Sequence, residues 1–162
     1  MSTDGNHESH HTANPAPSGL GGWMLLPFAG MAYTLIGTGR NLWSITDNPE
    51  LVRGIAGAIG DPASPYRPAL YSVGGGLVLM FFAATALLAM VLKTNRAPAL
   101  AQIFFICLVL DAGLEAWLGI ALQPGSPDWA LFAPLAGTIV GAAIWIPYFR
   151  RSKRVANTFR NR

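Results

Sequence analysis

The distribution of charged residues along the chain constrains its fold more than any other feature. Three long stretches contain no Asp, Glu, Lys or Arg: eighteen residues over 22–39, twenty-five over 68–92 and twenty-one over 129–149. An α-helix rises about 1.5 Å per residue, so roughly twenty apolar residues cross the hydrocarbon core of a bilayer. The two longer stretches meet this length and the first nearly does, so each predicts a membrane-spanning helix.

A fourth stretch, over 97–122, is apolar except for two acids. Asp111 and Glu115 interrupt it, and the fourteen uncharged residues before Asp111 are too few to cross a bilayer alone. The flanking segments, "KTNR" and "QPGSPD", are rich in turn-forming residues. We therefore predict one helix that carries two acids within the membrane. The predicted spans are then four, at about 22–39, 69–92, 97–122 and 130–149.

The composition supports a surface that faces lipid. Hydrophobic residues make up 52% of the chain and charged residues 12%, against roughly 25% charged in soluble domains. The predicted fold class is an all-α integral membrane protein, a four-helix bundle over 22–149. The polar N-terminal tail, 1–21, is expected to be disordered. His7, His10 and His11 in this tail could bind a metal, but no scaffold surrounds them, so we expect neither a metal site nor a cofactor.

The loop between the first two spans predicts a short amphipathic helix on the membrane surface. Asp47 or Asn48 can cap its start, Pro49 suits the first helical position, and Gly54 or Gly60 can end it.

Basic residues predict the orientation. Lys93 and Arg96 lie between spans two and three, and six more lie in a basic C-terminal tail, 150–162, against three in the outer loops. The positive-inside rule then predicts that both termini lie in the cytoplasm. Clustered charge of this kind favours anionic lipid headgroups as the partner over nucleic acid. The residues expected to anchor the inner surface are Trp145, Tyr148, Arg150, Arg151, Lys153 and Arg154.

Two motifs resemble a known family. "GGWMLLPFAG" over 21–30 is similar to its Gly-Gly-Trp-Leu-Leu-Leu-Pro opening, and "IWIPYFRRSKRVANTF" over 144–159 is similar to its C-terminal signature. The family is domain of unknown function 2569, small bacterial inner-membrane proteins with four spans. Asp111 resembles an acid in its third span, whereas Glu115 matches no family position. The resemblance implies location and topology, and it implies no activity.

Asp111 and Glu115 form the candidate polar site. They are four residues apart and so share a helix face, and a charge at the centre of a spanning helix costs about 2.5–3.5 kcal/mol. Such a pair could relay protons or bind a cation, or it could be structural. We expect Glu115 to pair with Arg40 or Arg67, which lie at the same outer end.

Small residues predict close packing of helices. Ala133, Gly137 and Gly141 lie on one face of span four, where they could pack within the bundle, in a dimer or on another membrane protein. The run Gly74, Gly75, Gly76 could loosen or closely pack the outer end of span two.

Sequence motifs of enzymes are absent: there is no nucleophile elbow, no phosphate-binding loop and no metalloprotease motif. We therefore expect a non-enzymatic accessory or assembly protein that packs on a membrane partner. The alternative is a small ion- or proton-coupled transporter that uses Asp111 and Glu115, as an oligomer.

Overall fold

The computed structural model describes residues 22–122 and 129–159, and in this part of the chain every regular element is helical. The helices are α1 (Leu25–Thr46), α2 (Pro49–Gly57), α3 (Arg67–Val91), α4 (Ala97–Leu122), α5 (Ala133–Arg151) and α6 (Lys153–Phe159). Short 3-10 turns precede α1, at Gly22–Met24, and α5, at Trp129–Phe132. The predicted all-α class is confirmed. The expectations for 1–21, including its three histidines, lie outside the described residues.

Prolines mark where most of these helices begin. Pro49 is the first residue of α2, and Pro68, Pro98 and Pro134 are each the second residue of α3, α4 and α5. A proline fits there because the first-turn N–H groups have no intrahelical partner to lose. Asn48 caps α2 by accepting a hydrogen bond from the Leu51 N–H at 3.1 Å. The predicted start of this helix is thus confirmed, and Gly54 lies inside it.

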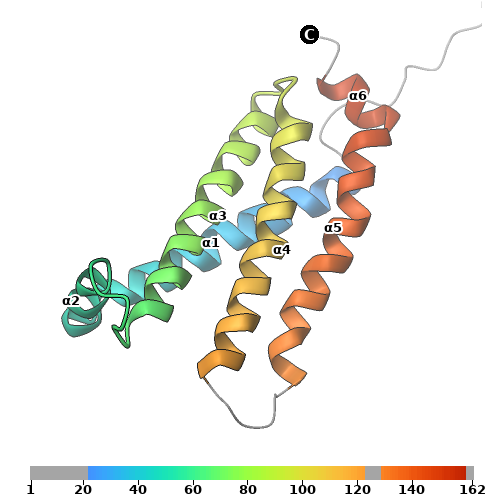
Figure 1. The fold of residues 1–162 in the computed structure, drawn as a ribbon. Coiled ribbons are helices and arrows are strands. Elements are labelled where there is room, and N and C mark those ends of the chain that lie inside the picture. Colours follow the sequence, from blue (N-terminus) through green and yellow to red (C-terminus); the bar gives the residue numbers. More distant parts are fainter. Residues whose placement is uncertain (1–21, 123–128, 160–162) are drawn as a thin grey trace, which may run out of the picture.

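Three helices are long enough and apolar enough to cross a membrane: α3, α4, and α5 with the 3-10 turn before it. They run side by side, while α1 runs obliquely behind them from the end near α6 to the end near α2 (Figure 1). The predicted bounds of 97–122 match α4. Helix α1 falls outside the set because Arg40 and Asn41 lie within it and lower its hydropathy. The helix continues to Thr46, seven residues beyond the predicted end of the span at Gly39.

The long helices pack in series, α1 on α3, α3 on α4 and α4 on α5. Within the described residues, α5 makes no comparable packing on α1 or α3, so the arrangement is open and the expected closed four-helix bundle is not formed. The share of side chains buried inside the protein falls accordingly from 33% in α3 to 6% in α5.

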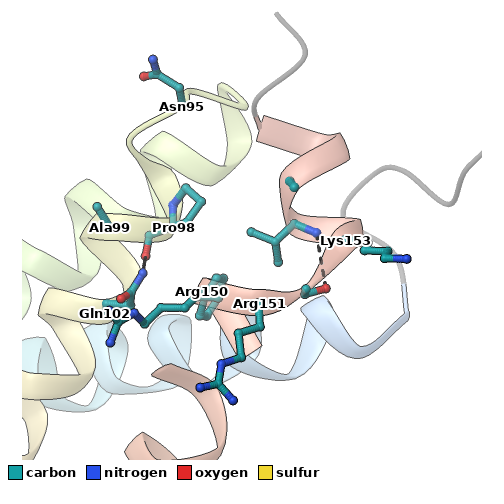
Figure 2. A pocket seen from close by; sticks show the side chains of 11 residues that line it. Asn95, Pro98, Ala99, Gln102, Arg150, Arg151 and Lys153 are labelled. Atoms are coloured by element: carbon teal, nitrogen blue, oxygen red, sulfur yellow. Dashed lines mark hydrogen bonds between the residues drawn. The ribbon is translucent and has the colours of Figure 1, made fainter. Parts of the chain in front are cut away.

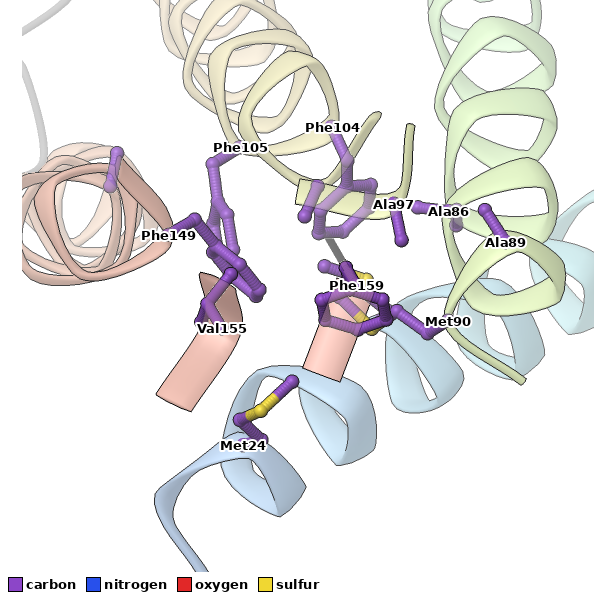
Figure 3. Close-up of a cluster of buried hydrophobic side chains, with 14 of the residues drawn as sticks. Met24, Ala86, Ala89, Met90, Ala97, Phe104, Phe105, Phe149, Val155 and Phe159 are labelled. Atoms are coloured by element: carbon purple, nitrogen blue, oxygen red, sulfur yellow. The ribbon is translucent and has the colours of Figure 1, made fainter. Parts of the chain in front are cut away.

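The hydrophobic core lies at one end of this layer, around α6. Phe159 is fully buried there, and Val155 is 2% exposed; both pack with Met24, Phe104 and Phe149 (Figure 3). The predicted boundary at residue 150 therefore does not separate a free basic tail. Helix α5 continues to Arg151, and after Ser152 the seven residues Lys153–Phe159 fold back as α6 because Val155 and Phe159 share one helical face.

Candidate functional site

The glycine run of α3 brings three helices together. A Cβ at Gly75 would overlap the Asp111 carboxylate of α4, and a Cβ at Gly76 would lie 3.1 Å from the Thr38 methyl group of α1. Gly74 faces open space. The close-packing interpretation of this run therefore holds at Gly75 and Gly76, where only a glycine leaves room for the neighbouring helix.

The two acids lie against these neighbours in different ways. Asp111 Oδ1 is buried and has no hydrogen-bond partner among the described residues. The Glu115 carboxylate, one turn along α4, accepts a hydrogen bond from the Ser72 hydroxyl of α3. The same helix thus holds one satisfied carboxylate oxygen and one buried oxygen whose hydrogen-bonding capacity is unused.

Two hollows meet at the acids. One, of about 300 Å³, lies between α1, α3 and α4, and its polar lining is Thr38, Asn41, Ser72, Asp111 and Glu115. The second, of about 580 Å³, opens between α1, α4 and the start of α5, and it includes the same two acids together with Tyr33, Thr34 and Thr138. We call the two hollows together the acid groove. It exists because α1 and α5 do not close on one another.

The acid groove has the chemistry of a site for a positive or hydrogen-bond-donating group. Two carboxylates and an amide supply acceptor oxygens, and electrostatic attraction is strongest at the buried one, Asp111 Oδ1. Thr34 and Thr138 add acceptor oxygens, because each hydroxyl donates its proton to a backbone carbonyl, of Gly30 at 3.0 Å and of Leu135 at 2.9 Å, and can still accept through its lone pairs. No group of three or more metal-ligating side chains occurs in the described residues.

The expected arginine partners do not reach Glu115. Arg67 Nε donates to the Tyr71 hydroxyl at 3.0 Å and its guanidinium lies over that ring. Arg40 is exposed, and no ion pair joins either arginine to an acid within 22–122 and 129–159. Ser72 takes the place that the sequence assigned to an arginine. Its only sequence signal is a hydroxyl within an apolar run, three residues before Gly75.

The predicted packing face of α5 is open. A Cβ at Gly137 or Gly141 would meet nothing within 4 Å, and Ala133 is exposed. Helix α5 instead contacts α4 through another side, which includes Ala142 and Phe149. We call Ala133, Gly137 and Gly141 the open α5 face.

The predicted surface-anchoring residues lie where α5 ends. Trp145 and Tyr148 stack edge to face, with ring centroids 5.5 Å apart, and both pack partly on the core. Arg150, Arg151 and Lys153 are exposed. Arg154 is half-buried against Gly22, which has a positive φ of 66°.

The fold and these apolar helices define an α-helical membrane protein. Within that class, a family described as "Protein of unknown function (DUF2569)" matches residues 17–160. The chain belongs to this family, which confirms the resemblance of its two end motifs. No curated protein and no solved structure matches the chain.

Proposed function

We propose that the chain is a four-span protein of the bacterial inner membrane with both termini in the cytoplasm. Helix α1 supports the fourth span, because its 22 residues extend for about 33 Å. Arg40 does not prevent this crossing, since long basic side chains near a helix end can extend to the headgroups. The excess of basic residues beside the α3–α4 turn and at the end of α5 supports the orientation.

Helix α2 fits the proposed outer surface. Ile55 is buried against the protein, whereas Glu50, Val52 and Arg53 are exposed. The exposed side therefore carries both apolar and charged side chains. In the proposed orientation the helix lies in the plane of the interface rather than across the membrane.

We infer that the protein is a non-enzymatic accessory or assembly protein that packs on a second membrane protein. The observation that carries this proposal is the open α5 face. Small residues give little advantage against lipid tails, but they let the backbone of another helix approach closely. Within the described chain no helix takes this place, so the face is available to a partner.

The acid groove adds a second reason for a partner. Its carboxylates lie beside an opening between α1 and α5, and a polar surface open to hydrocarbon is costly. A partner helix that carries a donor group would satisfy Asp111 Oδ1 and cover the opening. Water and a transported cation would satisfy it too, and this oxygen is the observation that favours the alternative, an ion- or proton-coupled transporter.

The test is gentle extraction of the tagged protein from its native membrane, followed by mass measurement and identification of what co-purifies. We expect a stoichiometric complex well above the 17.2 kDa of the single chain. Gly137→Leu should remove the partner, because the side chain would occupy the space of the approaching helix. Ala136→Leu is the matched control, since position 136 lies about 100° round the helix.

The two variants also separate assembly from folding. Neither substitution meets a neighbouring helix in this structure, and leucine favours helix over glycine by about 0.5–1 kcal/mol. Both variants should therefore keep the melting temperature of the wild type or exceed it. A homo-oligomer without any companion would reject the accessory function and favour transport, which Asp111→Asn should then abolish in a flux assay without unfolding the protein.

A further inference from the structure

A third hollow, separate from the two that form the acid groove, lies at the opposite end of the helical layer. It has a volume of about 440 Å³ and is formed between the start of α4, the end of α5 and the start of α6 (Figure 2). Its α4 wall contains Pro98, Ala99 and Gln102, and its other wall contains Phe149 to Lys153 with Val155 and Ala156. We call it the basic pocket.

The basic pocket has positive charge without any counter-charge from the residues that the structure describes. Arg150, Arg151 and Lys153 line it, and Arg150 extends towards Gln102 on α4 (Figure 2). The acids of the described chain are Asp47, Glu50, Asp61, Asp111 and Glu115. All five lie in the α1–α3 connection or in the second half of α4, so none contacts these cations.

The backbone adds to the positive potential of the pocket. Helix α4 begins at Ala97, so the positive end of its dipole lies at this wall. The N–H groups of Ala97 and Leu100 already bond to the carbonyls of Thr94 and Arg96, which leaves the N–H of Ala99, a lining residue, as the donor of this turn. Arginine side chains and N-terminal N–H groups are the donors that proteins commonly use to bind phosphate oxygens.

Beside the polar Asn95, Gln102 and Ser152, the rest of the lining is apolar, and this selects the kind of phosphate. Pro98, Ala99, Phe149 and Val155 give the pocket a hydrophobic side next to its cations. Trp145 and Tyr148, one turn earlier on α5, are side chains of the kind that lie at the level of lipid headgroups. A free phosphate would use only the cations, whereas a phospholipid would use both sides.

We propose that the basic pocket binds the phosphate group of one anionic phospholipid. This goes beyond a diffuse attraction between a basic tail and the membrane, because it assigns one lipid to one cavity. The proposal depends on the cytoplasmic end of the protein lying at the membrane surface, and it does not depend on the open α5 face or on any partner.

The experiment is native mass spectrometry of the full-length protein in detergent, with phosphatidylglycerol or phosphatidylcholine added at equal concentration. We expect one phosphatidylglycerol to remain bound and phosphatidylcholine to dissociate. The double variant Arg150→Gln, Arg151→Gln should weaken retention by roughly tenfold or more, because it removes two cationic donors of charged hydrogen bonds.

Arg96→Gln is the matched control. Arg96 is exposed at the same end of the protein and carries the same charge, but it does not line the pocket. It should retain the lipid as the wild type does. Equal loss in Arg96→Gln and in the double variant would overturn the proposal in favour of a diffuse field, and so would equal retention of the two lipids.

A competition arm identifies the source of the phosphate. Millimolar inorganic phosphate at constant ionic strength should leave phosphatidylglycerol bound, since phosphate cannot use the apolar side of the pocket. Displacement of the lipid by inorganic phosphate would assign the pocket to a soluble anion and reject the lipid. Unchanged elution volume and melting temperature of each variant exclude unfolding as the cause of any loss.

Discussion

Gly75 of α3 lies directly against the side chain of Asp111 on α4. The carboxylate lies where a Cβ at position 75 would be, so the absence of a side chain on α3 permits an acid on α4. The acid groove therefore depends on the absence of a side chain at position 75. The neighbouring Gly74 has no such role, because its side faces open space.

Gly75→Ala should destabilise the protein by about 1–3 kcal/mol, because the new methyl group must displace the Asp111 carboxylate or separate α3 from α4. Gly74→Ala should be neutral or stabilising by about 0.5–1 kcal/mol, since alanine favours helix and meets nothing there. Unfolding in mixed detergent micelles measures both. Combining Gly75→Ala with Asp111→Ala should recover most of the loss, and purely additive effects would show that the two residues do not clash.

Sequence reasoning found the acids of the site but not their surroundings. Asp111 and Glu115 stand out because charge is rare in an apolar stretch. Ser72, Thr38 and Asn41 do not, because single hydroxyl and amide groups are common in such helices. The expected ion pair between Glu115 and an arginine rests only on the positions of these residues along the helix axes. The structure instead turns Arg67 towards Tyr71 on its own helix, and Glu115 bonds to Ser72.

At the scale of the elements, the turn between α3 and α4 carries local strain. Lys93 has a φ of +52°, and the Thr94 N–H bonds to the Ala89 carbonyl while the Lys93 N–H bonds to the Met90 carbonyl. This pattern is a Schellman helix end, whose left-handed position is usually a glycine. A lysine there costs about 1–2 kcal/mol of backbone energy.

Lys93→Gly should stabilise the protein by roughly 1 kcal/mol, because glycine adopts a positive φ without steric cost. Lys93→Ala removes the same charge and keeps the strain, so it should give no gain. Thermal unfolding in detergent compares the two variants directly. Equal stability changes in both would attribute the effect to charge and not to backbone conformation.

The ends of the elements were harder to predict than their existence. The bounds of α4 follow from turn residues on both sides, and the prediction was close. For α1 the charge of Arg40 predicts an end at Gly39, but the helix continues to Thr46 and ends before the Asn48–Pro49 start of α2. The sequence analysis does not predict α6, because four basic residues indicate an exposed tail. The spacing of four between Val155 and Phe159 places these two side chains on one buried face.

At the scale of the whole molecule, the long helices form a series and not a closed bundle. Each of α1, α3 and α4 packs on the next, and α5 is left with one contacting side. Sequence patterns could predict the three apolar helices α3, α4 and α5, since these depend on local apolar length. They could not predict the open order, which depends on which side chains face each neighbour along α5.

Cysteine labelling tests the proposed crossing of α1. Cys107 is the only cysteine, so single exposed reporters can be placed on a Cys107→Ala background. In intact spheroplasts an impermeant maleimide should label Ala63→Cys, in the loop before α3, and should not label Trp23→Cys or Asn95→Cys. Labelling of Trp23→Cys together with Ala63→Cys would place α1 on the outer surface without crossing.

The most direct test of the account is photo-cross-linking from the open α5 face in native membranes. A photoreactive residue at position 137 should form an adduct with a second polypeptide, because this face has no neighbour within the described chain. The same residue at position 142, on the side of α5 that contacts α4, should give mainly intramolecular products. If position 137 yields no adduct heavier than the chain itself, the open face contacts only lipid and the assembly function is contradicted.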